Sequence, residues 1–130
     1  MPNAPKILVI DDDPSIRQLL TDVLEVGGFA VATAEDGYAG LRAIEADRPD
    51  CVVLDVMMPG MDGHAVLQRI RAADGGPDLP VVMLTAAAND AQAWQAWTEG
   101  VDYFLAKPFD PEELLRYLDY LFTTEGRVAV

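Results

Sequence analysis

The chain has 130 residues, of which 51% are hydrophobic, 22 are acidic and 9 are basic, giving a net charge of −13. This length is typical of one domain with a buried core, and the excess of acid disfavours direct contact with nucleic acid or an anionic membrane, because both depend on Lys and Arg. No apolar run approaches the roughly 18 residues of a membrane span, and the first residues lack a secretory-signal pattern, so we expect a cytoplasmic protein.

Apolar strand-like segments alternate with amphipathic helical segments along the chain. The first strand candidate, Lys6–Ile10, precedes a helical pattern in which apolar residues from Ile16 to Leu24 recur at i, i+3, i+4, i+7 and i+8, with Pro14 near the start. Gly27-Gly28 is expected to end that helix, because glycine tolerates left-handed backbone. The other strand candidates are Phe29–Ala34, Cys51–Leu54, Val81–Leu84 and Tyr103–Leu105.

The first, third and fourth of these runs are continuously apolar, which is typical of parallel strands covered on both faces. A last helical pattern, from Leu114 to Phe122, follows Pro111. Five strand–helix units in about 120 residues predict an α/β fold with an open, doubly wound parallel sheet. We expect one domain over residues 1–122, with residues 123–130 forming a tail or the start of a linker. Ligands of such sheets bind at the carboxyl ends of the strands.

Polar residues stand at the strand ends. Asp11-Asp12-Asp13 follows the first strand, Asp55 the third, Thr85 the fourth and Lys107-Pro108 the fifth. Carboxylates brought together there repel one another, and a pair about 4 Å apart costs on the order of 4 kcal/mol at an effective dielectric constant near 20. A hard divalent cation would remove this repulsion, and oxygen ligands with room for water favour Mg²⁺ over Zn²⁺.

Thr85 and Lys107 are poor metal ligands, but both bind phosphoryl groups well. The Lys ammonium is a point charge and the Thr hydroxyl is a hydrogen-bond donor. A metal site and a cation around one carboxylate are what phosphoryl transfer to an aspartate requires, since that reaction depends mainly on positioning and charge neutralisation. The strand ends therefore predict transfer of a phosphoryl group onto Asp55.

Four motifs, ILVIDDDP, VVLDVMMPGMDG, VVMLTA and YFLAKPF, in this order and spacing, resemble those of the receiver domain of two-component response regulators. The resemblance covers roughly Lys6 to Phe122 and implies a flavodoxin-like (βα)5 fold with strand order 2-1-3-4-5. It implies a phosphorylation-dependent signalling switch rather than an enzyme. A histidine kinase or a histidine phosphotransfer protein would donate the phosphoryl group, and a downstream effector domain or protein would read the changed face of the fourth helix, fifth strand and fifth helix.

The resemblance also gives roles to individual residues of the metal site. Asp55 matches the phosphoacceptor, which is also a metal ligand. Asp12 matches the acid that binds Mg²⁺ directly, and Asp11 the acid that acts largely through water. The backbone carbonyl of Met57 matches the third protein ligand.

A second group of positions surrounds the expected phosphoryl group. Thr85 matches the switch hydroxyl, Ala86 the small neighbour, Lys107 the phosphate-pairing lysine and Phe104 the aromatic switch position. Pro108 matches the family's cis-peptide position. Met57 and Ala87 carry no polar group to orient an attacking water, so we expect slow self-dephosphorylation.

Several residues keep more than one interpretation. Asp13 is expected to cap the first helix. Trp94 and Trp97 share a face of the predicted fourth helix. Trp97 is expected in the core, whereas Trp94 is open between an exposed partner contact and an ordinary surface position.

Family members that are transcription factors often carry charged dimer contacts where this chain has Ala93, Tyr103 and Tyr117. A homodimer of that type is therefore in doubt, with an apolar contact through Trp94 as the alternative.

Three rival functions explain the residues less well. An aspartyl phosphatase of the haloacid-dehalogenase type could use Asp11 and Asp13, but leaves Asp55 unexplained. A flavodoxin-like electron carrier needs a hydroxyl- and glycine-rich phosphate loop where this chain has acids. A pure interaction domain does not explain the complete residue set.

Overall fold

Five parallel strands form one sheet in the order β2-β1-β3-β4-β5, which confirms the predicted order. The computed structural model describes residues 4–85 and 100–125 of the chain, with side chains to residue 123. Its strands are β1 (Lys6–Ile10), β2 (Ala30–Ala34), β3 (Cys51–Asp55), β4 (Val81–Thr85) and β5 (Tyr103–Ala106). The fold is flavodoxin-like, as predicted.

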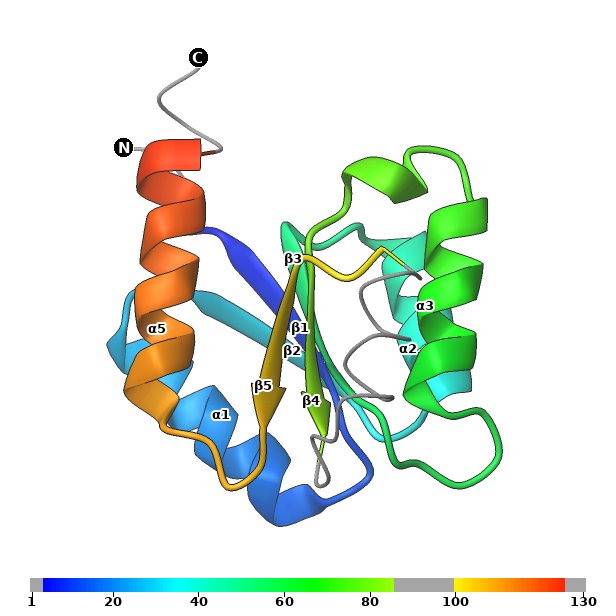
Figure 1. Cartoon of the computed structure of the whole chain (residues 1–130), viewed down its shortest axis with the longest axis horizontal. Coiled ribbons are helices and arrows are strands. Elements are labelled where there is room, and N and C mark those ends of the chain that lie inside the picture. Colours follow the sequence, from blue (N-terminus) through cyan, green and yellow to red (C-terminus); the bar gives the residue numbers. More distant parts are fainter. Residues whose placement is uncertain (1–3, 86–99, 126–130) are drawn as a thin grey trace.

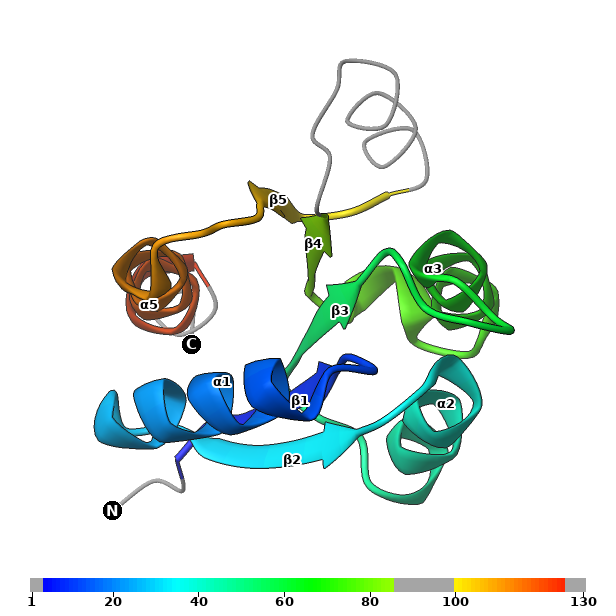
Figure 2. The ribbon, with the colours of Figure 1, turned by 90° about the horizontal axis from the view of Figure 1, so that it is seen from below.

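Helices cover both faces of the sheet (Figures 1 and 2). On one face lie α1 (Pro14–Val26) and α5 (Pro111–Tyr120), and on the other lie α2 (Gly37–Ala46) and α3 (Gly63–Ala72). A 3₁₀ turn, η1 (Gly76–Asp78), precedes β4, and a π-helical turn, η2 (Leu121–Glu125), continues α5. No helix within residues 4–85 and 100–125 is long and apolar enough to cross a membrane. The predicted fourth helix, with Ala86, Ala87, Ala93, Trp94 and Trp97, lies outside the described residues.

Every one of these four α-helices begins at an aspartate whose side chain accepts a hydrogen bond from a backbone N–H of the first turn. A carboxylate at this position satisfies a donor that the helix leaves unpaired and interacts favourably with the helix dipole. The prediction that Asp13 caps the first helix is thereby confirmed. The four caps are Asp13, Asp36, Asp62 and Asp110.

Two apolar clusters sandwich the sheet, because successive side chains of a strand point to opposite faces. Ile7 and Val9 of β1 belong to the cluster under α1 and α5, whereas Leu8 and Ile10 belong to the cluster under α2 and α3. All residues of β3 and β4 are buried. This double coverage explains why the central strands are continuously apolar in sequence.

The strand ends differ from prediction by one residue. β3, β4 and β5 each run one residue further than expected, so that Asp55 and Thr85 lie inside the sheet. Backbone bonds explain the difference: the N–H of Val56 donates to the carbonyl of Leu84 (2.9 Å), and that of Lys107 to the carbonyl of Thr85 (2.6 Å). β2 starts at Ala30 rather than Phe29, since the Phe29 N–H bonds to Leu24 at the end of α1.

Candidate functional site

Three carboxylates meet at the carboxyl ends of β1 and β3. The register pairs Ile10 with Leu54, which brings Asp11 and Asp55 side by side one residue further on. One carboxylate oxygen from each of Asp11, Asp12 and Asp55 lies within 4.8 Å of the others. Asp11 and Asp55 are buried, whereas Asp12 is exposed. The structure thus brings together the acids that the sequence predicted to be close.

Lys107 reaches this cluster from the end of β5. Its Nζ donates to Asp55 Oδ1 at 3.2 Å and to Asp11 Oδ2 at 3.4 Å. The Lys107–Pro108 peptide bond is cis, as the family resemblance implied. One ammonium group therefore serves two buried carboxylates, which leaves the cluster with excess negative charge.

The electrostatics of Asp55 reflect that excess. Burial, followed by the charge of Asp11, raises the pKa of Asp55 from 3.8 to about 6. The charge and hydrogen bond of Lys107, and a hydrogen bond from the Met57 backbone, lower this pKa only in part. Burial also lowers the pKa of Lys107, but the charges of Asp55 and Asp11 outweigh that effect and raise it overall. Lys107 thus stays an ammonium group at neutral pH.

Removing the Asp55 carboxylate is expected to stabilise the metal-free fold at neutral pH. Because the folded-state pKa lies above its ordinary value, the folded protein binds more protons than the unfolded chain between these two values. The contribution of Asp55 to the free energy of unfolding therefore falls as pH rises from about 4 to about 6, and stays lower above that range. We expect Asp55→Asn to raise the free energy of unfolding by about 1 to 3 kcal/mol at neutral pH in the presence of a chelator.

Urea unfolding on both sides of this pH window measures the effect. The gain should disappear below a pH of about 4, where the carboxyl group is protonated in both states. Asp74→Asn, which removes an exposed acid outside the cluster, is the matched control and should change the unfolding free energy little. An Asp55→Asn protein less stable than the parent at neutral pH would contradict the prediction.

The remaining predicted site residues have these positions. Thr85 is fully buried at the end of β4, and Phe104 packs against the cluster under α2 and α3. Met57 is 64% exposed just after β3. Ala86 and Trp94 lie outside the described residues. Asp13 is occupied as a helix cap, which disfavours the phosphatase interpretation that needed it as a catalytic acid.

Three contacts were missed by sequence reasoning. Arg17, one turn into α1, donates from Nη1 to the backbone carbonyl of Asp11 at 2.7 Å and so helps to position this acid. Tyr103 and Tyr117 stack with ring centroids 4.3 Å apart and an interplanar angle of 10°, and the Tyr103 hydroxyl donates to Glu113 at 2.8 Å. For the Arg17 contact the sequence does contain a signal, because Arg17 is the only basic residue of α1 and follows the acidic segment closely.

Known proteins resemble this chain in sequence. The family described as "Response regulator receiver domain" matches residues 7–119. The DNA-binding dual master transcriptional regulator RpaA of Synechocystis sp. is 40% identical over 124 residues, which cover 95% of this chain and 52% of that protein. Response regulator MprA of Mycolicibacterium vanbaalenii is 44% identical over 110 residues, covering 85% and 47%. The chain spans about half the length of the curated relatives it matches.

Solved structures show the same fold. Chemotaxis protein CheY4 of Vibrio cholerae is 34% identical with a TM-score of 0.84, covering 89% of this chain and 97% of that one. A putative response regulator from Chloroflexus aurantiacus is 32% identical with a TM-score of 0.86, covering 91% and 97%. The sequence matches and the structural matches therefore indicate the same family.

Proposed function

The chain belongs to the family of response regulator receiver domains, and from this membership we propose a phosphorylation-dependent signalling switch in which Asp55 accepts the phosphoryl group. The observation that carries the proposal is the position of the Lys107 ammonium, 3.2 Å from Asp55 in a cluster of three carboxylates. Three carboxylates with one cation are unfavourable by themselves, but the Lys107 ammonium would stabilise the negative charge that Asp55 gains with a phosphoryl group.

Phosphoryl transfer would use the residues of this chain as follows. An Asp55 oxygen attacks the phosphorus of a phosphohistidine on a histidine kinase or phosphotransfer protein. The new O–P bond forms as the N–P bond breaks, and the electron pair stays on the donor imidazole nitrogen. Lys107 pairs with the charge on the transferred oxygens. In this scheme the phosphoryl group ends on the chain itself, so we propose a regulatory domain rather than an enzyme, as fits the receiver-domain family.

The donor set of the cluster fits Mg²⁺, because it offers only oxygen atoms and one of its acids faces solvent. Asp11, Asp12, Asp55 and the backbone carbonyl of Met57 would hold the ion. Bound there, Mg²⁺ supplies neutralising charge for the transferred phosphoryl group.

The readout would follow from the added charge. A phosphoryl group brings about −1.5 to −2 charges, which Thr85 can meet with its hydroxyl. We propose that Phe104 then repacks and changes the face that β5 and α5 form with the fourth helix predicted from the sequence, for a cytoplasmic effector or a second copy. Relatives about twice as long as this chain are named as DNA-binding regulators, so the effector we propose is an output domain joined to a receiver domain at residues 1–122.

A small phosphodonor tests the function directly. Incubation of the chain with acetyl phosphate and Mg²⁺ should add the mass of one phosphoryl group, and mild alkali should remove it, as expected of an acyl phosphate. Replacing Mg²⁺ by EDTA should slow incorporation by about 100-fold or more, because several kcal/mol of charge stabilisation are lost. No mass increase with Mg²⁺, or equal incorporation in EDTA, would sink the proposal.

Slow loss of the phosphoryl group is a further expectation. Met57 lies exposed beside the site and carries no group that could position water. Met57→Asn should shorten the phosphoryl lifetime by about 10-fold, since an oriented water speeds hydrolysis. Unchanged decay in Met57→Asn, followed by mass spectrometry, would count against this explanation.

A further inference from the structure

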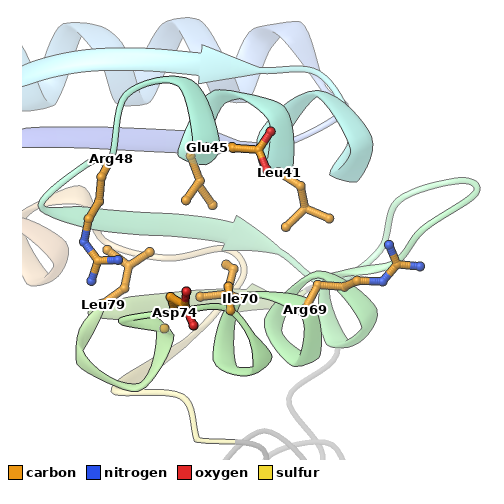
Figure 3. Close-up of a pocket in the computed structure, with 10 residues that line it drawn as sticks. Leu41, Glu45, Arg48, Arg69, Ile70, Asp74 and Leu79 are labelled. Atoms are coloured by element: carbon orange, nitrogen blue, oxygen red, sulfur yellow. The ribbon is translucent and has the colours of Figure 1, made fainter.

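A groove between α2 and α3 is not used by the proposed phosphoryl chemistry (Figure 3). Its volume is about 550 Å³, and apolar side chains from both helices and the following turn line most of it. Ile70 and Leu79 are buried core residues, and Leu41 and Ile44 pack against the same cluster while staying partly exposed. Small-molecule sites typically have volumes of about 300 to 1,000 Å³ and a largely apolar lining with a few polar groups.

Charged side chains surround this apolar surface. Arg48 and Arg69 lie at opposite ends of the groove, and Glu45 and Asp74 lie between them (Figure 3). The Arg48 guanidinium is oriented by a hydrogen bond from Nη2 to the carbonyl of Gly75 at 2.9 Å. Its other N–H groups donate to no residue of the described ranges, so they remain available to an acidic group. Arg69 points away from the apolar surface, which leaves Arg48 as the anchor.

We propose that this groove binds a small molecule with a compact apolar body and a single carboxylate or sulfonate group. The body would cover Leu41, Ile44 and Ile70, and the acidic group would form charge-assisted hydrogen bonds with Arg48. A second acidic group would lie near Glu45 or Asp74 and would be repelled. A protein partner fits less well, because the groove has ten lining residues against the roughly 20 to 30 that a protein interface uses on each side.

The groove is separate from the acidic cluster. Gly76 and Leu79 line it just before β4 begins, at the amino ends of the strands, whereas Asp55 lies at the carboxyl end of β3. The proposed binding therefore does not depend on phosphorylation of Asp55, and either proposal can fail without the other. A bound ligand would stabilise the fold, since it binds the folded state and contacts core residues from α2 and α3.

Fluorescence titration with anilinonaphthalene sulfonate, an aromatic body with one sulfonate, tests the proposal on the full chain. We expect one saturable site, weakened by about tenfold or more in Arg48→Gln, because a hydrogen bond to a charged group is lost. Arg42→Gln is the matched control: it makes the same change on an exposed residue of α2 that does not line the groove. A disulfonate with the same anilinonaphthalene body should bind at least about tenfold more weakly than the monosulfonate, because of its second negative charge.

Amide chemical-shift changes in the unsubstituted protein locate the bound probe without relying on a variant. Support requires that the shifts map to α2, α3 and η1, and that thermal unfolding shows Arg48→Gln to be folded. Equal affinity of Arg48→Gln and Arg42→Gln would overturn the proposal. Shifts centred instead on the other apolar surface, formed by Ile16, Leu19 and Phe109, would overturn it as well.

Discussion

Asp55→Asn is expected to take up no phosphoryl group from acetyl phosphate and Mg²⁺ under conditions in which the parent chain is fully labelled. The side-chain amide has no anionic oxygen to attack phosphorus, and it removes one ligand of the proposed metal site. We expect incorporation to fall by about 1,000-fold or more, the size of effect seen when a nucleophile is removed. Intact-mass spectrometry over time measures it.

Loss of labelling in this variant is not explained by unfolding, because Asp55→Asn is expected to be more stable than the parent in the absence of metal. The charge of Lys107 also stays paired, through its bond to Asp11 at 3.4 Å. Asp74→Asn serves as the control and should label at the parent rate. Should Asp55→Asn accept phosphate as fast as the parent, the acceptor would be a different side chain, and Asp11 or Asp12 would be the next to change.

Gly63→Ala is expected to destabilise the fold by about 3 kcal/mol, because added atoms cannot be accommodated in a tightly packed place. Gly63 begins α3, and its N–H donates to the carbonyl of Val56 at 2.9 Å. A Cβ at this position would lie 2.4 Å from the carbonyl oxygen of Asp55 and 2.8 Å from the Cα of Val56. Both are backbone atoms, so α3 itself would have to move away from β3.

Urea unfolding of Gly63→Ala and of Gly28→Ala separates this clash from the general effect of adding a methyl group. A Cβ on Gly28 meets no atom within 4 Å, and only its φ of +96° opposes the change. Its cost should be about 1 to 2 kcal/mol, the penalty of a left-handed backbone for an L-residue. If Gly63→Ala cost no more than Gly28→Ala, the close approach of α3 to Asp55 would be of little energetic importance.

Much of the fold and of the candidate site can be predicted from the sequence. The apolar runs predict the strands because the parallel sheet is covered on both faces, and the polar residues after them converge because parallel strands end at one edge. The exact strand ends are not visible: Asp55 and Thr85 look like loop residues, yet their backbones continue the hydrogen-bonded ladder. The periodicity of apolar residues predicts which face of the sheet a side chain occupies. It does not show whether backbone hydrogen bonds continue at a polar residue.

Contacts between distant segments were the least predictable part. Lys107 was expected to serve the phosphoryl group, but its second bond, to Asp11, depends on how far β5 lies from β1 across the sheet. The link from Arg17 to the Asp11 carbonyl depends on the angle at which α1 leaves its cap. The groove between α2 and α3 likewise depends on the separation of two helices, which no local pattern of residues encodes.

The placement of Asp55 inside β3 has a consequence for selectivity among phosphodonors. The backbone of Asp55 is held in the hydrogen-bonded ladder between β3 and β4. If Asp55 is the phosphoacceptor, as proposed, every donor, small or large, would therefore have to bring its phosphorus to the same position. Recognition of one cognate protein over its competitors would then be the task of the surrounding surface. The Asp55 carboxylate itself would not discriminate among the donors of the phosphoryl group.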